Sequence, residues 1–517
     1  MEELVETEKP QETSKKGDAT KKQIRGSSLL LFGRLLSVGL NFASQVLIVR
    51  YLSKADFGAW AYALSVVAFF QGLSTLGLDR GITRFIPIYH ERDEQHKLLG
   101  TIIFVLIVTA ISSVLIIASF HAWPEFIAKL VKEKDQPVDL ILIMIFLVPV
   151  DAIDGLLIAL FASFASPRAI FFRKHVLAPG LKLTAVLLLV FLQAEVDFLA
   201  WGYLTAGALG VAIYGVMLLR LLYRQGTFDN MTLSKIKIPA KEILAFTIPL
   251  LSSDLVTIVM HSLDSLLLGY YHSPEAVGAY RAILPAAHFN KVVATSFALL
   301  YTPLAARLFA NGDNAGINEL YWKTAIWMAV LSFPVFALTF SLAQPLTVAL
   351  YGARYESSWV YLALMSFGYY FNTALGFNGL TLKVLGKIRY VVIINTAAGL
   401  FNLLLAWLLI PPYGALGAAL ATAIAMVVYN ILKQAGLRLA AGLHIFEWQY
   451  LSFYLILIAG AALLFVIQWL SSASIYVDVA LAALVSFAVL AICKKRLKVE
   501  ETFPELMKLP LLKKILK

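Results

Sequence analysis

Apolar blocks of about 20 residues, the length of a membrane-spanning helix, recur along almost the whole chain and leave few folds open to it. One of them, "SSLLLFGRLLSVGLNF", runs from Ser27 to Phe42. A helix of this length crosses the roughly 30 Å of hydrocarbon in a bilayer. The 517 residues are 60% hydrophobic, with a mean hydropathy of +0.78, whereas a soluble domain is about 45–50% apolar. The sequence therefore predicts an all-α integral membrane protein.

About fourteen such segments can be marked along the chain. They lie near residues 26–50, 57–78, 98–122, 138–163, 170–193, 197–222, 242–270, 275–304, 319–349, 357–382, 389–410, 413–436, 448–470 and 474–493. Several contain proline, which a membrane helix tolerates where neighbouring helices or a water-filled cavity satisfy the freed carbonyl group. We therefore expect about fourteen transmembrane helices, packed against one another.

Basic residues alternate between the two sides of the predicted spans. They gather in both tails and after even-numbered spans, in the connections near 80–97, 168–174, 220–241, 383–389 and 433–438. Cytoplasmic loops carry such an excess of Lys and Arg. The pattern predicts a multi-pass protein of the cell (cytoplasmic) membrane with both termini in the cytoplasm. Residues 1–25 would form a disordered cytoplasmic tail and residues 496–517 a basic one. The net charge of +11 then reflects orientation, and we expect no nucleic acid partner.

The sequence lacks the motifs of the common catalytic and metal sites. A single cysteine, Cys493, excludes an internal disulfide and a cysteine-based metal site. No GxxxxGK[ST], HExxH or GxSxG motif occurs, and no long external loop offers room for a catalytic domain. We therefore predict that the protein is not an enzyme and has no catalytic residues, no cofactor and no metal centre.

A short motif is repeated between the two halves of the chain. "YLSKADFGAW" at residues 51–60 resembles "YHSPEAVGAY" at residues 271–280, so that Tyr51 corresponds to Tyr271 and Trp60 to Tyr280. Internal repeats are a signature of secondary transporters. We expect two pseudo-symmetric six-helix lobes around a central cavity, formed by residues 26–224 and 242–437. A cytoplasmic linker, 225–241, would join them, and two C-terminal helices would follow within 438–495.

Arg34 lies in the middle of the first apolar block, where a charged side chain costs roughly 2.5–3.5 kcal/mol. The repeat places Arg34 opposite Asp254 and Gln71 opposite Lys291 in the other lobe. Arg34 has no acid near it in its own predicted hairpin. A guanidinium in a cavity wall suits a phosphate group, so we expect Arg34 to bind an anionic head group.

The seventh and eighth spans carry two matching sets of ionisable residues. The sets, with the same spacing, are Asp254, His261 and Asp264, and Arg281, His288 and Lys291. In an antiparallel hairpin that turns near residue 272, Asp264 matches Arg281 in depth, and Asp254 matches Lys291. We expect ion pairs across the hairpin, which serve either ion coupling or only helix packing.

Two further groups of charges have two open interpretations each. Arg80 and Arg84, at the cytoplasmic end of the second span, either guide a head group inward or anchor the helix as ordinary loop cations. Asp151 and Asp154 share a helical face of the fourth span. They form either a cation or proton site or a polar packing contact, and the second interpretation is favoured.

Three long stretches resemble a known superfamily of transporters. They are "GRLLSVGLNFASQVLIVRYLSKADFGAWAYALSVVAF" at 33–69, "FTIPLLSSDLVTIVMHSLDSLLLGYYHSPEAVGAYRAI" at 246–283 and "NTAAGLFNLLLAWLLIPPYGALGAALATAIAMVVYN" at 395–430. The resemblance is to the multidrug/oligosaccharidyl-lipid/polysaccharide exporter superfamily, and within it to the polysaccharide-biosynthesis branch of O-antigen-type flippases. It covers residues 26 to about 495.

The resemblance implies a V-shaped pair of lobes that flips polyprenyl-pyrophosphate-linked oligosaccharide between leaflets by alternating access. It implies cations on spans 1, 2 and 8 for the pyrophosphate, which match Arg34, Arg281 and, more weakly, Lys291; Gln71 stands where span 2 would supply a cation. The expected partners are the lipid-linked oligosaccharide, membrane lipid and a coupling ion, H⁺ or Na⁺, and the expected state is a monomer. The alternatives are a multidrug or organic-cation antiporter of the same fold and, less favoured, a membrane polysaccharide polymerase.

Overall fold

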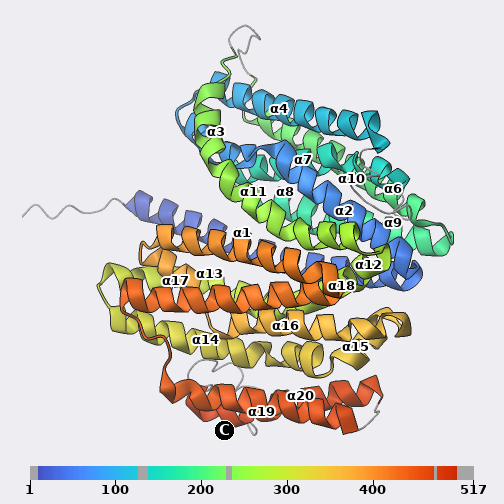
Figure 1. Cartoon of the computed structure of the whole chain (residues 1–517). Helices are drawn as coiled ribbons and strands as arrows, with labels where there is room; N and C mark the ends of the chain where they lie inside the picture. The colour runs from blue at the N-terminus through green and yellow to red at the C-terminus, as the bar shows by residue number, and fades with distance from the viewer. Residues whose placement is uncertain (1–9, 126–137, 165, 229–235, 471–473, 498–517) are drawn as a thin grey trace, which may run out of the picture. The chain divides into compact units, whose positions relative to one another are not determined.

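All regular structure in the part of the chain that the computed structural model describes is helical (Figure 1). That part comprises residues 10–125, 138–164, 166–228, 236–470 and 474–497. The first half contains α1 (Pro10–Tyr51), α2 (Lys54–Thr75), α3 (Leu78–Glu91), α4 (Gln95–Ala122), α6 (Val138–Met144), α7 (Leu147–Ser163), α8 (Pro167–Ile170), the π-helix η1 (Phe171–Leu177), α9 (Ala178–Phe191) and α10 (Val196–Arg224).

The second half continues with helices of more varied length. They are α11 (Ala240–Tyr271), α12 (Pro274–His288), η3 (Phe289–Lys291), α13 (Val292–Ala310), α14 (Asn314–Phe336), the π-helix η4 (Ala337–Ser341), α15 (Ala343–Tyr351), η5 (Ala353–Ser358), α16 (Trp359–Ala374), α17 (Asn378–Val384), α18 (Ile388–Ala441), η6 (Trp448–Tyr450), α19 (Leu451–Leu470) and α20 (Ile475–Leu497).

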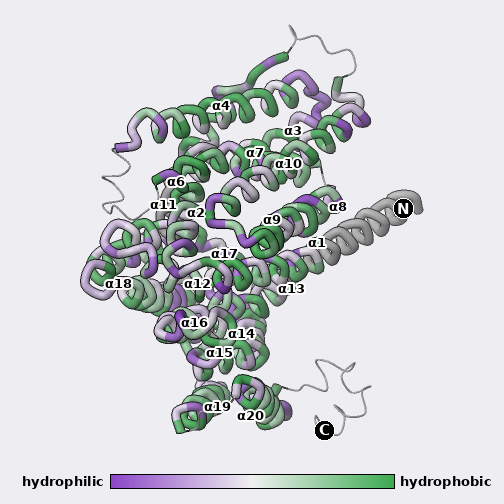
Figure 2. Tube along the Cα trace, turned by 90° about the vertical axis from the view of Figure 1, so that its right-hand side faces the viewer, coloured by the Kyte–Doolittle hydropathy of each residue, from purple (hydrophilic) through white to green (hydrophobic). Residues whose placement is uncertain are grey.

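The apolar blocks fold into helices long enough to cross a bilayer, which confirms the prediction of an all-α membrane protein. Within the described residues, 10 helices meet that criterion by length and composition, or 11 if the bent pair Pro274–Ala298 and Leu300–Ala310 is counted as one span. Figure 2 shows hydrophobic residues along the length of these helices. The count of about fourteen stays a prediction.

The segment α18, 54 residues long, comprises the predicted spans 389–410 and 413–436 as two helices that meet at a kink. Its backbone leaves helical geometry at Gly414, where φ is 55° and ψ is −131°. Glycine reaches that region without the steric cost of a Cβ atom, and the preceding Pro411 and Pro412 lack the N–H groups of a regular helix. The break therefore lies where the sequence predicts the turn between these two spans.

The first helix begins earlier than the sequence predicts. The helix α1 starts at Pro10, inside the segment 1–25 that the polar composition assigns to a disordered tail. Residues 11–25 include many Glu, Gln, Lys and Ala residues, which have high helix propensity. They extend the membrane helix without a new nucleation step, which is the costly part of helix formation. Residues 1–9 and the predicted tail beyond residue 497 lie outside the described residues.

The chain divides into two compact units, which we describe separately. Unit 1 comprises residues 1–52 and 63–262, and unit 2 comprises residues 53–62 and 263–517. The division falls within α2 and within α11, so the start of α2 packs as part of unit 2. The predicted lobe boundaries, 26–224 and 242–437, stay a prediction.

Unit 1 packs around one apolar core, to which α3, α4, α7 and α10 contribute. Leu78 and Ile82 of α3 are fully buried in it. The ring of Phe161 stacks on Tyr214 with centroids 4.3 Å apart. Because lipid is as apolar as these side chains, close packing rather than escape from water holds such helices together.

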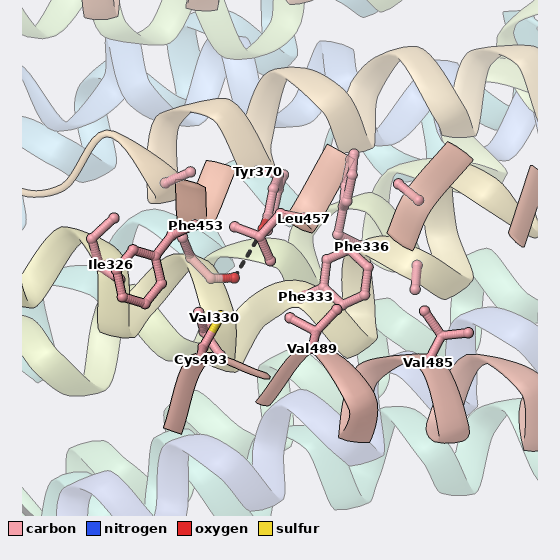
Figure 3. Close-up of a cluster of buried hydrophobic side chains, with 14 of the residues drawn as sticks. Ile326, Val330, Phe333, Phe336, Tyr370, Phe453, Leu457, Val485, Val489 and Cys493 are labelled. Atoms are coloured by element: carbon pink, nitrogen blue, oxygen red, sulfur yellow. Dashed lines mark hydrogen bonds between the residues drawn. The ribbon is translucent and has the colours of Figure 1, made fainter. Parts of the chain in front are cut away.

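The two C-terminal helices contribute to an apolar core of unit 2 (Figure 3). Phe453 and Leu457 of α19 and Val489 of α20 pack with Phe333 of α14. The ring of Phe336 stacks on Tyr370 with centroids 4.0 Å apart. Helices α19 and α20 are therefore an integral part of unit 2.

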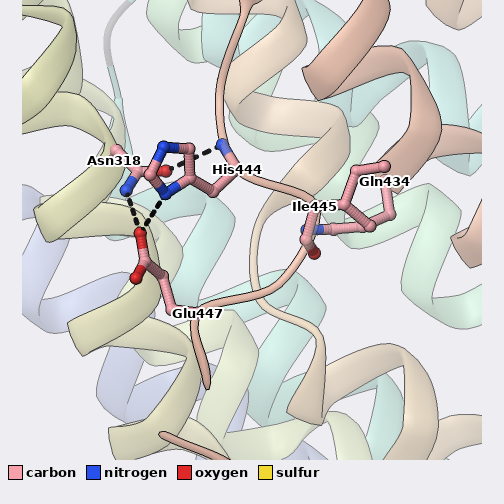
Figure 4. Close-up of polar contacts among 5 residues, drawn as sticks. All are labelled: Asn318, Gln434, His444, Ile445 and Glu447. Atoms are coloured by element: carbon pink, nitrogen blue, oxygen red, sulfur yellow. Dashed lines mark hydrogen bonds and ion pairs between the residues drawn. The ribbon is translucent and has the colours of Figure 1, made fainter. Parts of the chain in front are cut away.

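The connection that leads to α19 is fixed by polar contacts (Figure 4). Asn318 of α14 accepts a hydrogen bond from the backbone N–H of His444 and donates one to Glu447, at 3.2 and 2.9 Å. Gln434 of α18 donates to the carbonyl of Ile445 at 2.8 Å. These bonds tie the segment after α18 to two different helices of unit 2.

We predict that Phe333→Ala destabilises the protein by about 3 kcal/mol, at the lower end of the range for buried phenylalanines, because in lipid mainly packing contacts are lost. Phe333 is fully buried, whereas Leu331 on the same helix is 36% exposed. Leu331→Ala is therefore the control and should have less than half of that effect. The free energy of unfolding, measured by denaturant titration in mixed micelles, checks both; equal losses would contradict the packing described here.

Candidate functional site

Arg34 lies on an exposed face of α1, next to a face that packs closely within unit 1. On the packed face, a Cβ atom at Gly33 would lie only 2.6 Å from the Phe171 ring and 2.8 Å from the His175 ring. One turn further on, Ser37 shares a hydrogen bond of 2.9 Å with Nδ1 of His175. Gly33 and Ser37 therefore seat α1 on the π-helix η1.

The Arg34 side chain leaves α1 beside this packed face. Residue 34 follows Gly33 by about 100° around the helix, and its charge still acts on His175 of η1. None of the ion pairs among the described residues includes Arg34. Its neighbours Phe32 and Leu35 are also exposed. The arrangement leaves the cation available to a ligand.

A buried ion pair lies on the other face of the same π-helix. Arg173 of η1 is 3% exposed, and its Nη2 lies 2.7 Å from Oδ1 of Asp154 on α7. A Cβ atom at Gly210 of α10 would lie 2.8 Å from the guanidinium carbon, so only glycine leaves room there. The charges of Asp151 and Lys182 act on the same carboxylate.

This ion pair corrects one sequence interpretation and supports another. The alternating loop charges assign Arg173 to a cytoplasmic connection, but it lies inside a helical segment, within unit 1. For Asp154 the structure supports the favoured interpretation, a polar packing contact. The sequence signal that could have revealed this pair is an acid in one span, Asp154, followed by a cation at the start of the next span, Arg173. A π-bulge then rotates that residue inward.

In unit 2, Asp264 and Arg281 form part of a polar cluster between α11, α12 and α18. Oδ2 of the buried Asp264 accepts hydrogen bonds from Tyr280 at 2.8 Å and from Thr422 at 2.9 Å. Nε of Arg281 donates to Ser265 at 2.6 Å. These contacts agree with the predicted register of the hairpin. These three hydrogen bonds all join a charged side chain to a hydroxyl group. The charge of Arg281 also acts on the Asp264 carboxylate.

Lys291 and His288 extend the cluster to α16. Nζ of Lys291 lies 3.7 Å from the centroid of the Tyr369 ring, a cation–π contact. Nε2 of His288 shares a hydrogen bond of 2.8 Å with the Tyr369 hydroxyl. The expected partner of Lys291, Asp254, and the neighbouring His261 have side chains outside the described residues. Tyr280, Tyr369 and Thr422 are members that the charge pattern alone does not reveal.

The remaining predicted residues lie elsewhere in unit 1. Gln71 is half-buried on α2, and its backbone carbonyl accepts a hydrogen bond from the Ser74 hydroxyl. Arg80 and Arg84 lie on α3, which is separated from α2 by a turn at Leu76 and Gly77, both with positive φ. The guanidinium of Arg84 lies 4.2 Å from the centroid of the Phe246 ring. Arg84 thus contacts an aromatic ring, and both interpretations of Arg80 and Arg84 stay open.

The structure brings Asp264, Arg281, His288 and Lys291 together in unit 2, and it places Arg34 and Gln71 in unit 1. Within the described residues, no group of three or more His, Cys, Asp or Glu side chains could hold a metal ion. Unit 2 thus carries a polar cluster with two cationic side chains, Arg281 and Lys291, on membrane helices.

Two family models match the sequence. The model described as "Polysaccharide biosynthesis protein" matches residues 24–309, and the MatE model matches residues 249–408. An uncharacterized membrane protein of Methanocaldococcus jannaschii, MJ1068, is 20% identical over 78% of this chain and 81% of its own. The capsular polysaccharide biosynthesis protein CapF of Staphylococcus aureus is 25% identical over 36% of this chain and 48% of its own.

Solved structures share the fold. The lipid II flippase MurJ, in an inward closed conformation, superposes with a TM-score of 0.66 at 14% identity, covering 92% of this chain and 99% of MurJ. An inward-facing MATE-family multidrug resistance transporter gives a TM-score of 0.62 at 14% identity, covering 77% of this chain and 92% of its own. The chain therefore has the fold of the transporters and flippases of this superfamily.

We predict that removing one partner of the Asp154–Arg173 pair is more harmful than removing both. Arg173→Met should destabilise unit 1 by less than the about 3–5 kcal/mol of a fully buried pair, because Asp154, 21% accessible, loses its direct partner while the charge of Lys182 still acts on it. Adding Asp154→Leu should recover part of that loss. Unfolding titrations of the single and double variants measure the difference.

The exposed pair Glu319–Lys323 on α14, with side chains 61% and 55% accessible, is the matched control. Its disruption should cost less than about 1 kcal/mol. An additive or greater loss in the Asp154–Arg173 double variant would contradict a packing role for that pair.

Proposed function

Because the chain belongs to the polysaccharide biosynthesis protein family of the multidrug/oligosaccharidyl-lipid/polysaccharide exporter superfamily, we propose that it is a lipid-linked oligosaccharide flippase. It would carry polyprenyl-(pyro)phosphate-linked oligosaccharide from the cytoplasmic to the outer leaflet of the cell membrane, for polysaccharide export. The observation that carries the proposal is the exposed arginine in the first membrane span, Arg34, beside the face by which α1 packs on η1.

Such a substrate poses a specific physical problem. A pyrophosphate and its sugars cannot cross hydrocarbon unaided, because polar and charged groups lose their hydration there. The protein has to offer cations for the phosphates and a polar path for the sugars, while the prenyl tail stays in lipid. Arg34 suits the first task, because a guanidinium donates two parallel hydrogen bonds to a phosphate.

The cluster in unit 2 would supply the second set of cations. Arg281 is oriented by Ser265, and Lys291 lies over the Tyr369 ring. A guanidinium carries five N–H groups and an ammonium three, so each cation can also serve a phosphate oxygen or a sugar hydroxyl. Asp264, held by Tyr280 and Thr422, would bind a coupling H⁺ or Na⁺; the membrane potential acting on the charged substrate is the other candidate driving force.

A multidrug or organic-cation antiporter is the second candidate, favoured by the MatE family model over residues 249–408. The matched region includes Arg281, His288 and Lys291. A cation-rich surface would repel an organic cation and attract an anion. The charge of the cluster therefore supports the flippase over the antiporter.

Orientation follows from the loop charges. Basic connections after the even-numbered spans place both termini in the cytoplasm, so that the end of α1 and the start of α2 face outward. A monomer is sufficient for this mechanism, and it needs no catalytic residue.

We predict that Arg34→Ala slows the transfer of lipid-linked glycan about 10- to 100-fold, because a charge-assisted hydrogen bond to phosphate contributes about 1.5–3 kcal/mol. Arg34→Lys should retain more activity, since it keeps the charge and loses only the paired geometry. The measurement is the leaflet distribution of lipid-linked glycan in cells depleted of the native protein and supplied with each variant.

Arg220→Ala, which removes an exposed arginine of α10, is the matched control and should transfer glycan at the wild-type rate. Wild-type transfer by Arg34→Ala, at equal protein level in the membrane, would refute the role of Arg34. Efflux of an organic cation without glycan transfer would favour the antiporter.

A further inference from the structure

The two copies of the repeated decad contact each other within unit 2, through residues 53–60 of the first copy and 271–280 of the second. Serine begins each helix: Ser53 accepts from the backbone N–H of Asp56 at 3.0 Å, and Ser273 is the N-cap of α12. The alignment of the two copies maps Gly58 onto Gly278 and Lys54 onto Pro274. The structure therefore brings the equivalent turns of α2 and α12 together.

The crossing is made by backbone atoms, in a reciprocal way. A Cβ atom at Gly58 would overlap the carbonyl oxygen of Pro274. A Cβ atom at Gly278 would lie 2.7 Å from the carbonyl oxygen of Lys54 and 3.2 Å from Cα of Gly58. Each glycine thus packs against the carbonyl group of the residue four positions before the other glycine. These two residues, Pro274 and Lys54, are equivalent in the repeat. This is the contact that a two-fold relation between the repeats produces, and small residues allow such close approach in membranes.

The surroundings of the crossing are tightly packed. Phe57 and Trp60 are each 1% exposed, and the Tyr62 ring packs on Gly269. The ammonium of Lys54 lies 5.7 Å from the centroid of the Tyr355 ring. The start of α2 consequently belongs to unit 2, whereas the rest of the helix, from Ala63 on, belongs to unit 1.

We propose that the Gly58–Gly278 crossing is a latch that closes the outer face of the protein and parts when that face opens. The inference rests on the proposed alternating access, which requires the outer ends of the two repeats to separate once in each cycle. The crossing joins these ends, and the loop charges place them on the outer side. Closure then depends on two positions that tolerate no side chain.

The test is the accessibility of a cysteine inside the latch. Ala59 and Ala279 are equivalent in the repeat and are 3% and 4% exposed, so Ala59→Cys or Ala279→Cys reports opening. The native thiol is first removed by Cys493→Ser. The probe is a membrane-impermeant maleimide added to intact cells. In the parent we expect slow labelling of either reporter.

Gly58→Ala should raise the labelling rate of both reporters about tenfold, the change given by a shift of about 1.4 kcal/mol in the balance of closed and open states. Gly278→Ala should act in the same direction and less strongly, because its steric overlap is smaller. Gly39→Ala on α1, where a Cβ atom would meet nothing within 4 Å, is the control and should leave labelling unchanged.

Unchanged labelling in folded Gly58→Ala and Gly278→Ala would overturn the latch. Failure of both variants to reach the membrane as folded protein would also overturn it, because the crossing would then be a fixed part of the fold. Labelling needs no substrate, so the result is independent of the glycan transfer assay. A latch that opens in a protein without glycan transfer would refute only the proposed substrate.

Discussion

Polar groups within a hydrocarbon layer have to find their partners inside the protein, and this constraint organises the structure. Unit 1 meets it with a direct ion pair, Asp154 and Arg173, beside a glycine that leaves room for the guanidinium. Unit 2 meets it with hydroxyl groups, which bond to Asp264 and Arg281 separately. The first solution uses both charges in one contact. The second gives each charge hydroxyl partners of its own.

The π-helix η1 links structure and the candidate site in unit 1. A π-helix widens the turn by one residue and so changes which side chains point inward. Within η1, Arg173 faces Asp154, while Phe171 and His175 face α1. A single local distortion therefore places one cation in the core and holds the helix that carries the other, Arg34. The ion pair in the core and the packing of α1 therefore depend on the same short segment.

The sequence predicts those features that follow from period and spacing. Apolar blocks as long as a bilayer is thick predict the membrane helices. Matched depths in the hairpin predict an ion pair of Asp264 with Arg281, and this pairing stays a prediction. The sequence does not predict the hydroxyl partners Tyr280 and Thr422, because uncharged residues at helical spacing resemble ordinary packing. It also misplaces Arg173, since loop charges and buried cations look alike until a π-bulge shows which way the side chain turns.

The two repeats preserve backbone geometry and differ in chemistry. Gly58 and Gly278 are identical because each is pressed against the backbone of the other decad, and any side chain at either position would collide there. By the same alignment of the repeats, Arg34 corresponds to Asp254 and Gln71 to Lys291, so the charges have diverged. Residues fixed by close packing keep the identity that the fold demands. Residues free of that demand can differ between the two halves of the chain, and these two pairs have done so.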